Sequence, residues 1–103
     1  MRPGVRLAVD VGTVRVGLAR SDAGGILALP LETLTRQDDA SEINEIVRYA
    51  HELEVIEIIV GLPRHMRGAE GISAKGARRY ARKLKMVLPE CRVCLVDERL
   101  SSH

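Results

Sequence analysis

The sequence predicts an α/β fold, with a mixed five-stranded sheet of strand order 3-2-1-4-5 and flanking helices. Three strand-like segments joined by short glycine-containing links open the chain, and two amphipathic segments with helical spacing follow, each leading into an apolar, β-branched run. The element order is therefore β-β-β-α-β-α-β. Because crossovers between parallel strands are right-handed, the fourth and fifth strands are expected beside the first. At 103 residues, residues 1–103 are expected to form a single domain with one core.

The first three strands are predicted to form two antiparallel hairpins. Residues 5–11, VRLAVDV, place four apolar residues on one face and Arg6, Ala8 and Asp10 on the other. The second strand, VRVGLARSD at 14–22, follows the Gly12-Thr13 turn, and the third is ILALPLETL at 26–34. Pro30 predicts that the third strand lies at a sheet edge, because the missing backbone N–H of a proline harms no ladder there.

The rest of the chain alternates helices with strands that are typical of a parallel sheet. Residues 38–53 place Ile43, Ile46, Val47, Ala50 and Leu53 on one stripe, and Asp39 with Glu42 matches a capping box. VIEIIVGLP at 55–63 is a buried-type strand that Gly61 and Pro63 close. A second helix is expected from Ile72 to Leu88 with a buried stripe of Ala77, Ala81, Leu84 and Leu88, before the last strand, CRVCLVDER at 91–99.

Composition narrows the class of protein. The chain is 46% hydrophobic and 29% charged, with a net charge of +2. It lacks the roughly 20 consecutive apolar residues of a membrane span, and MRPGVR lacks a signal-peptide core, so a cytoplasmic protein without membrane contact is expected. Two tyrosines are the only aromatic residues, so nucleic acid would be held by its phosphates and shape rather than by base stacking. Cys91 and Cys94 should point to opposite faces of a strand, which favours structural thiols over a redox or zinc pair.

Acidic residues are predicted to gather at one edge of the sheet. Asp10, Gly61 and the pair Asp97-Glu98 all end parallel strands, and ligands of open α/β sheets bind at that edge. Strands one and five would lie roughly 10 Å apart, so their carboxylates could share a Mg²⁺ or Mn²⁺ with bonds of about 2.1 Å, above the space that Gly61 leaves. An acid at the end of a buried strand also needs a positive partner. Alternatively, Asp10 forms an Asx turn with Thr13, and the later acids pair with Arg99.

Three motifs carry a resemblance to a known family. DVGTVRVGLARSD from Asp10, IIVGLPRHMRGAEG from Ile58 and VDERLSS from Val96 resemble the YqgF family, also called RuvX, over about Leu7 to Ser102. Members are RuvC-like proteins with an RNase H-like fold. The resemblance implies a metal-dependent nuclease, described both as a Holliday-junction resolvase and as the enzyme that matures the 5′ end of pre-16S rRNA in ribosome biogenesis.

The resemblance also implies site residues. Asp10 and Glu98 correspond to metal ligands, Asp97 is a further catalytic candidate, and Arg99 would face the substrate phosphates. The family continues into a C-terminal helix with another aspartate in a D-x-x-A setting, whereas this sequence stops at His103. We therefore expect a C-terminally incomplete domain that lacks one carboxylate, and an uncovered sheet face that favours a homodimer. In the full site, two Mg²⁺ or Mn²⁺ ions would flank the scissile phosphate.

The second predicted helix supplies a candidate nucleic-acid surface. Six cations with no acid among them lie within it: Lys75, Arg78, Arg79, Arg82, Lys83 and Lys85. A solvated helix face is the alternative, but the arginines upstream favour phosphate binding. The remaining candidate contacts are Arg15, Arg64, His65, Arg67 and Arg99, with Gly12, Gly61 and Pro63 as turn residues.

Three functional hypotheses remain open. A nuclease could take precursor rRNA, also within pre-ribosomal particles, or branched DNA, because both reactions need the same chemistry. A nucleic-acid-binding ribosome-assembly module without catalysis is the second hypothesis. DVGTVRVG also resembles the first phosphate loop of the actin and sugar-kinase ATPases, but those proteins need a second domain to close over the nucleotide.

Overall fold

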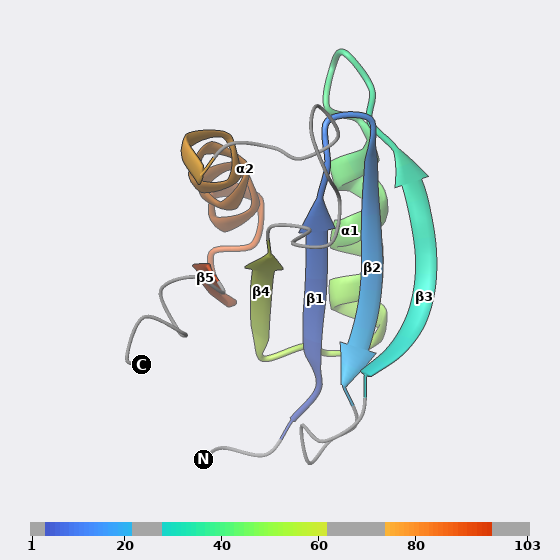
Figure 1. The fold of residues 1–103 in the computed structure, drawn as a ribbon. Coiled ribbons are helices and arrows are strands. Elements are labelled where there is room, and N and C mark those ends of the chain that lie inside the picture. Colours follow the sequence, from blue (N-terminus) through green and yellow to red (C-terminus); the bar gives the residue numbers. More distant parts are fainter. Residues whose placement is uncertain (1–3, 22–27, 62–73, 96–103) are drawn as a thin grey trace, which may run out of the picture.

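The computed structural model describes residues 4–21, 28–61 and 74–95. Along these residues the elements follow the predicted order (Figure 1). They are β1 (Arg6–Val11), β2 (Arg15–Ser21), β3 (Ala28–Thr35), α1 (Glu42–Glu52), β4 (Glu57–Gly61), α2 (Ala74–Val87) and β5 (Arg92–Leu95). No helix among these residues is long and apolar enough to cross a membrane.

The strands form one sheet of order β3-β2-β1-β4-β5, as the sequence predicts. β1 pairs with β2, and β2 with β3, in antiparallel fashion, whereas β1–β4 and β4–β5 are parallel. Pro30 lies in the edge strand β3, which confirms its predicted place. It sits beside a register shift between Leu18 and Ala19, where an irregular ladder tolerates a residue without an N–H.

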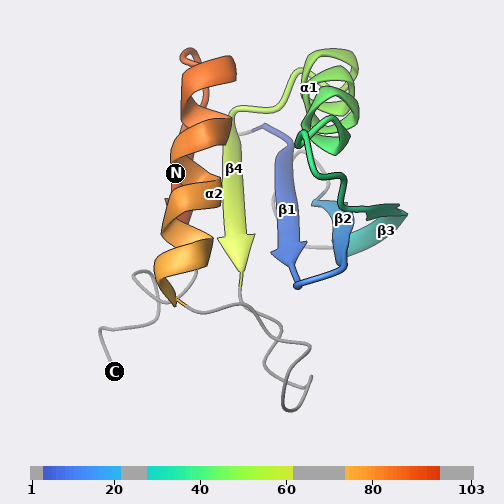
Figure 2. The ribbon, with the colours of Figure 1, turned by 90° about the horizontal axis from the view of Figure 1, so that it is seen from above.

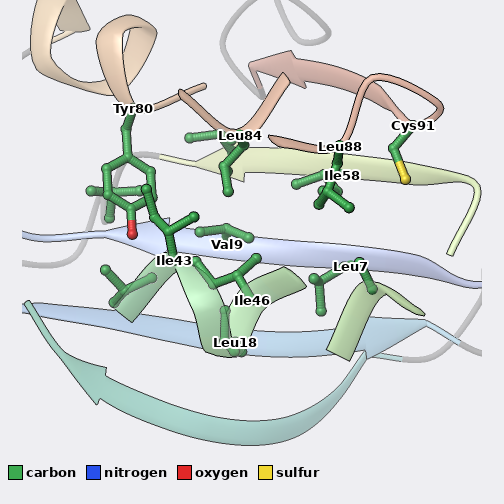
Figure 3. Packing of buried hydrophobic residues seen from close by; sticks show 14 of the residues in the cluster. Leu7, Val9, Leu18, Ile43, Ile46, Ile58, Tyr80, Leu84, Leu88 and Cys91 are labelled. Atoms are coloured by element: carbon green, nitrogen blue, oxygen red, sulfur yellow. The ribbon is translucent and has the colours of Figure 1, made fainter. Parts of the chain in front are cut away.

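One face of the sheet carries the core. Leu7, Val9 and Val11 of β1 are completely buried, and the same face of β4 buries Ile58 and Val60. Residues from both helices cover this face, as Figure 3 shows for Ile43 and Ile46 of α1 and for Tyr80 and Leu84 of α2. Leu88, the residue after α2, packs there too. The opposite face of β1 presents Arg6, Ala8 and Asp10, which are not buried. The predicted alternation is therefore confirmed.

Two local predictions need correction. The capping box of Asp39 and Glu42 is wrong: α1 begins after Ser41, and the buried Glu42 carboxylate accepts from the Gln37 backbone N–H and the Tyr80 hydroxyl. A tertiary contact thus outweighs the local one. The predicted stripe of α2 is correct but incomplete, because Tyr80, which is 3% exposed, also belongs to it.

The two cysteines lie on different sides of the sheet. Cys91 is buried in the core, whereas Cys94 donates from Sγ to Glu57 Oε2 at 3.1 Å on the other face. Both are free thiols. This agrees with the expectation of two structural thiols rather than a redox pair.

Candidate metal and nucleic-acid site

Asp10 stands between two glycines. In the observed register it pairs with Gly17 of β2 on one side and with Gly61 of β4 on the other. Directly paired residues of neighbouring strands point to the same face of a sheet. The carboxylate of Asp10 is therefore flanked by no side chain from either adjacent strand. We call Asp10, Gly17 and Gly61 the glycine notch.

The sequence identifies only one of these glycines. Gly61 is expected beside the acidic edge, whereas Gly17 lies inside the second predicted strand and, although it is part of the DVGTVRVGLARSD motif, is given no role by the sequence. A signal does exist: the tight turn between β1 and β2, closed by the Gly12 N–H donating to the Arg15 carbonyl at 2.8 Å, fixes the antiparallel register. Counting paired residues away from that turn, Val11 pairs with Val16, and Asp10 then pairs with Gly17.

The hydration argument for a cation at Asp10 is wrong. Asp10 is exposed, because it lies on the face opposite the buried residues of β1. Its carboxylate keeps contact with water, so burial does not demand a positive partner. The case for a metal rests instead on the hard oxygen ligand and on the space that the two glycines leave around it.

The other expected acidic ligands lie outside the described residues. These are Asp97 and Glu98, and the same holds for Pro63, Arg64, His65, Arg67 and Arg99. Within the described ranges, no three His, Cys, Asp or Glu side chains form a group that could hold a metal ion. The parallel pairing of β4 with β5 up to Val60 and Leu95 shows that the last strand runs toward the same edge as β1.

Arg15 lies on the Asp10 side of the sheet. It opens β2, is exposed, and alternates with the buried Val16. Residues 15 and 17 of one strand share a face, so Arg15 stands two residues from the partner of Asp10. Among the predicted phosphate contacts in the described part of the chain, it is the one on a strand that pairs with β1.

Helix α2 exposes a row of cations. Lys75, Arg78, Arg79, Arg82 and Lys83 are exposed, and among the described residues no ion pair is seen for them. We call these five residues the α2 basic face. Lys85 is different, because its Nζ donates to the backbone carbonyls of Pro89 and Cys91 and so closes the end of the helix.

Helix α1 shows the contrasting pattern. Its arginine, Arg48, bonds to Glu45 at 2.6 Å and to Glu52 at 3.1 Å within the same helix. Of the two helices, α2 therefore carries the greater positive charge. A polyanion would be attracted to α2 rather than to α1.

The glycine notch and the α2 basic face lie on opposite faces of the sheet but share one edge. The carboxyl ends of β1 and β4 and the first turn of α2 all lie at that edge (Figure 2). A nucleic acid that contacts both features must therefore pass around this edge.

Comparison with known proteins identifies relatives along nearly the whole chain. The sequence model of one protein family, described as "RuvX: Holliday junction resolvase", matches residues 4–103. A protein of Kineococcus radiotolerans named "Putative pre-16S rRNA nuclease" is 50% identical over 103 residues, covering 99% of this chain and 55% of its own. Relatives of the same name in Thermobifida fusca and Mycobacteroides abscessus are 48% and 45% identical, over 99% and 96% of this chain and 63% and 60% of their own. The chain thus spans between about half and two thirds of the length of these relatives.

Proposed function

Because this chain belongs to the RuvX family and has the sheet order of an RNase H-like fold, we propose that it carries part of the active site of a divalent-metal-dependent nuclease. The substrate we propose is the 5′ region of precursor 16S rRNA, free or within pre-ribosomal particles in the cytoplasm. The names of its relatives support this substrate. The observation that carries the proposal is the exposed Asp10 carboxylate in the glycine notch, at the carboxyl-terminal edge of the sheet.

The donor chemistry of the notch fits a hard cation. Asp10 offers carboxylate oxygens, which Mg²⁺ and Mn²⁺ prefer, and Asp97 and Glu98 are the further proposed ligands. An added Cβ at Gly17 would approach the Asp10 Cβ at 3.8 Å, so the glycine leaves open a volume that a side chain would fill. When bound, the metal supplies charge neutralisation at the phosphate and promotes attack by water.

The chain's own residues would bind and orient the substrate. The α2 basic face would attract phosphates without reading bases, and Arg15 would add a contact on the Asp10 face of the sheet. Arg99 is a further proposed phosphate contact, on the family resemblance alone. If about four phosphates are held, the logarithm of the affinity for a duplex should fall against the logarithm of the salt concentration with a slope of about −3.6. A slope near zero would exclude this surface as the binding site.

A second candidate is the resolution of four-way DNA junctions, which the description of the family favours. It uses the same metal chemistry on DNA. A junction resolvase needs two symmetric active sites, so a homodimer in solution would favour this candidate over an rRNA nuclease that acts as a monomer.

The experiment compares cleavage of a pre-16S 5′-leader RNA and a four-way DNA junction in Mn²⁺ or Mg²⁺. It uses this chain and a version extended by the C-terminal helix that the family resemblance implies. Asp10→Asn is the test variant. Asp38→Asn is the matched control, because it removes the same charge from an exposed turn before α1.

Cleavage that Asp10→Asn abolishes and Asp38→Asn leaves intact would establish the nuclease, and the cleaved substrate would identify its target. Binding should survive in Asp10→Asn, because losing a negative charge does not weaken phosphate contacts. Binding without metal-dependent cleavage by either version would refute the nuclease and leave a non-catalytic assembly module.

A further inference from the structure

The turn that follows Asp10 is held by a residue from another part of the chain. Arg36 is the first residue after β3. Its backbone N–H donates to the Val14 carbonyl at 2.8 Å, and its side-chain Nη1 donates to the Gly12 carbonyl at 3.0 Å. One residue therefore contacts both arms of the turn. The first bond survives most substitutions, but the second needs a long side chain with a directed N–H donor.

The guanidinium of Arg36 is itself held in place from the other side. Its Cζ lies 5.3 Å from the centre of the Tyr80 ring, within the range of a cation–π contact. Tyr80 points from α2 toward the sheet (Figure 3), and its hydroxyl donates to Glu42 Oε2 at 2.9 Å. The other oxygen of Glu42 accepts from the Gln37 N–H at 3.0 Å. The ring is thus fixed, and so is the arginine above it.

This arrangement links two features that the proposed function needs together. The turn belongs to the strand pair that carries Asp10, and Tyr80 belongs to the helix that carries the α2 basic face. We propose that Arg36 is a positioning residue: it fixes the turn behind Asp10 relative to α2, so that a phosphate chain bound by α2 reaches the Asp10 carboxylate at one set distance. The kinetic part of this inference rests on the proposed nuclease function.

The chain contains a matched control for the arginine–tyrosine contact. Arg48 of α1 lies over the Tyr49 ring with its Cζ 4.7 Å from the centre, and it bonds to Glu45 and Glu52. Its bonds lie within α1, far along the chain from the Gly12 turn. Removing Arg48 and removing Arg36 thus both eliminate an arginine over a tyrosine, but only the second removes a bond to the turn.

The experiment measures amide hydrogen exchange at Gly12 and Ile58, together with kcat and KM for cleavage, in Arg36→Lys, Arg36→Met and Arg48→Met. Gly12 reports on the turn, because its N–H donates to the Arg15 carbonyl, and Ile58 reports on the buried sheet. Arg36→Met should speed exchange at Gly12 about tenfold and leave Ile58 unchanged. It should lower kcat about 10- to 100-fold with KM within about twofold, because misplacing reacting groups by about 1 Å has that cost. Arg36→Lys should fall between Arg36→Met and the natural chain, and Arg48→Met should match the natural chain.

Unchanged exchange at Gly12 in both Arg36 variants would overturn the proposal. Equal acceleration at Gly12 and Ile58 would also overturn it, because that result describes general loss of stability. Equal effects of Arg36→Met and Arg48→Met would overturn it as well, because the effect would then come from packing over a tyrosine ring and not from the bond to the turn. If the natural chain and its extended version cleave neither substrate, the proposed function fails. The exchange at Gly12 then still decides whether Arg36 holds the turn.

Discussion

Replacing Gly17 by alanine should raise stability and weaken metal binding at the same time. No conformational requirement keeps glycine at this position, because among the described glycines a positive φ occurs at Gly4 and not at Gly17. An added Cβ would lie 3.8 Å from the Asp10 Cβ, which is an ordinary van der Waals distance. Since glycine within a strand is less stable than alanine by roughly 0.5–1 kcal/mol, the free energy of unfolding without metal should rise by about that amount.

Metal affinity should change in the opposite direction. The new methyl group would stand beside the Asp10 carboxylate, where an ion at about 2.1 Å from the oxygen needs room for its remaining ligands. Mg²⁺ retains several water molecules in near-octahedral geometry, so one displaced water is costly. We expect Mn²⁺ and Mg²⁺ to bind about tenfold more weakly, which corresponds to about 1.4 kcal/mol. Gly17→Val should weaken binding further, because its two methyl groups occupy more of the notch.

The assay combines urea unfolding with Mn²⁺ titration by calorimetry. Ala19→Val is the matched control, because Ala19 lies on the same face of β2 but pairs with Ala8 instead of Asp10. The control should leave the Mn²⁺ affinity unchanged. The reasoning would be refuted if Gly17→Ala and Gly17→Val bound Mn²⁺ as tightly as the natural chain, since the space between Gly17 and Asp10 would then serve no metal.

Two further predictions concern the core. Tyr80→Phe removes the donor to the buried Glu42 carboxylate and should lower the free energy of unfolding by about 1–3 kcal/mol, measured by urea unfolding. Burial, followed by the hydrogen bond to Glu42, raises the pKa of Tyr80, so the folded state holds this proton more tightly than the unfolded one. The contribution of Tyr80 to the free energy of unfolding is complete below about pH 10, the pKa of an unfolded tyrosine, and is lost as the pH rises further. If the free energy of unfolding of Tyr80→Phe fell as steeply above pH 10 as that of the natural chain, this assignment would be contradicted. Burial likewise raises the pKa of the Cys91 thiol, so at pH 8 iodoacetamide should modify it much more slowly in the native chain than in urea, as mass spectrometry can test; equal rates would contradict the buried position.

The fold could be predicted because each level of the sequence points to the same structure. Alternation from residues 5 to 11 gives the buried face of β1, and helical spacing gives both helix stripes. Pro30 selects the edge, and the handedness of crossovers then leaves few strand orders. The observed order β3-β2-β1-β4-β5 is the one that these rules favour.

The site could be predicted only in part, because its remaining features depend on tertiary contacts. Asp10 stands out as an acid at a strand end, but its exposure depends on which face the helices cover. Gly17 matters through a register that is set by the turn. Arg36 contacts a carbonyl 24 residues away and the Tyr80 ring on α2, and no local pattern encodes such a pair. Glu42 shows the same limit, since its partner is Tyr80.

The placement of charge suggests a division of roles between two surfaces. The exposed Asp10 carboxylate remains hydrated, so the protein keeps its negative charge available for a ligand without a buried counter-charge. The α2 basic face lies on a helix that covers the other face of the sheet, and it would attract phosphates over a distance that salt controls. Substitutions on the two surfaces should therefore affect nucleic-acid binding and metal-dependent cleavage separately. Asp10→Asn should remove cleavage and leave the salt slope unchanged, whereas Arg78→Gln with Arg82→Gln should reduce the slope by about 2 and leave the metal requirement intact. Loss of both properties in either variant would mean that the two surfaces act as one site.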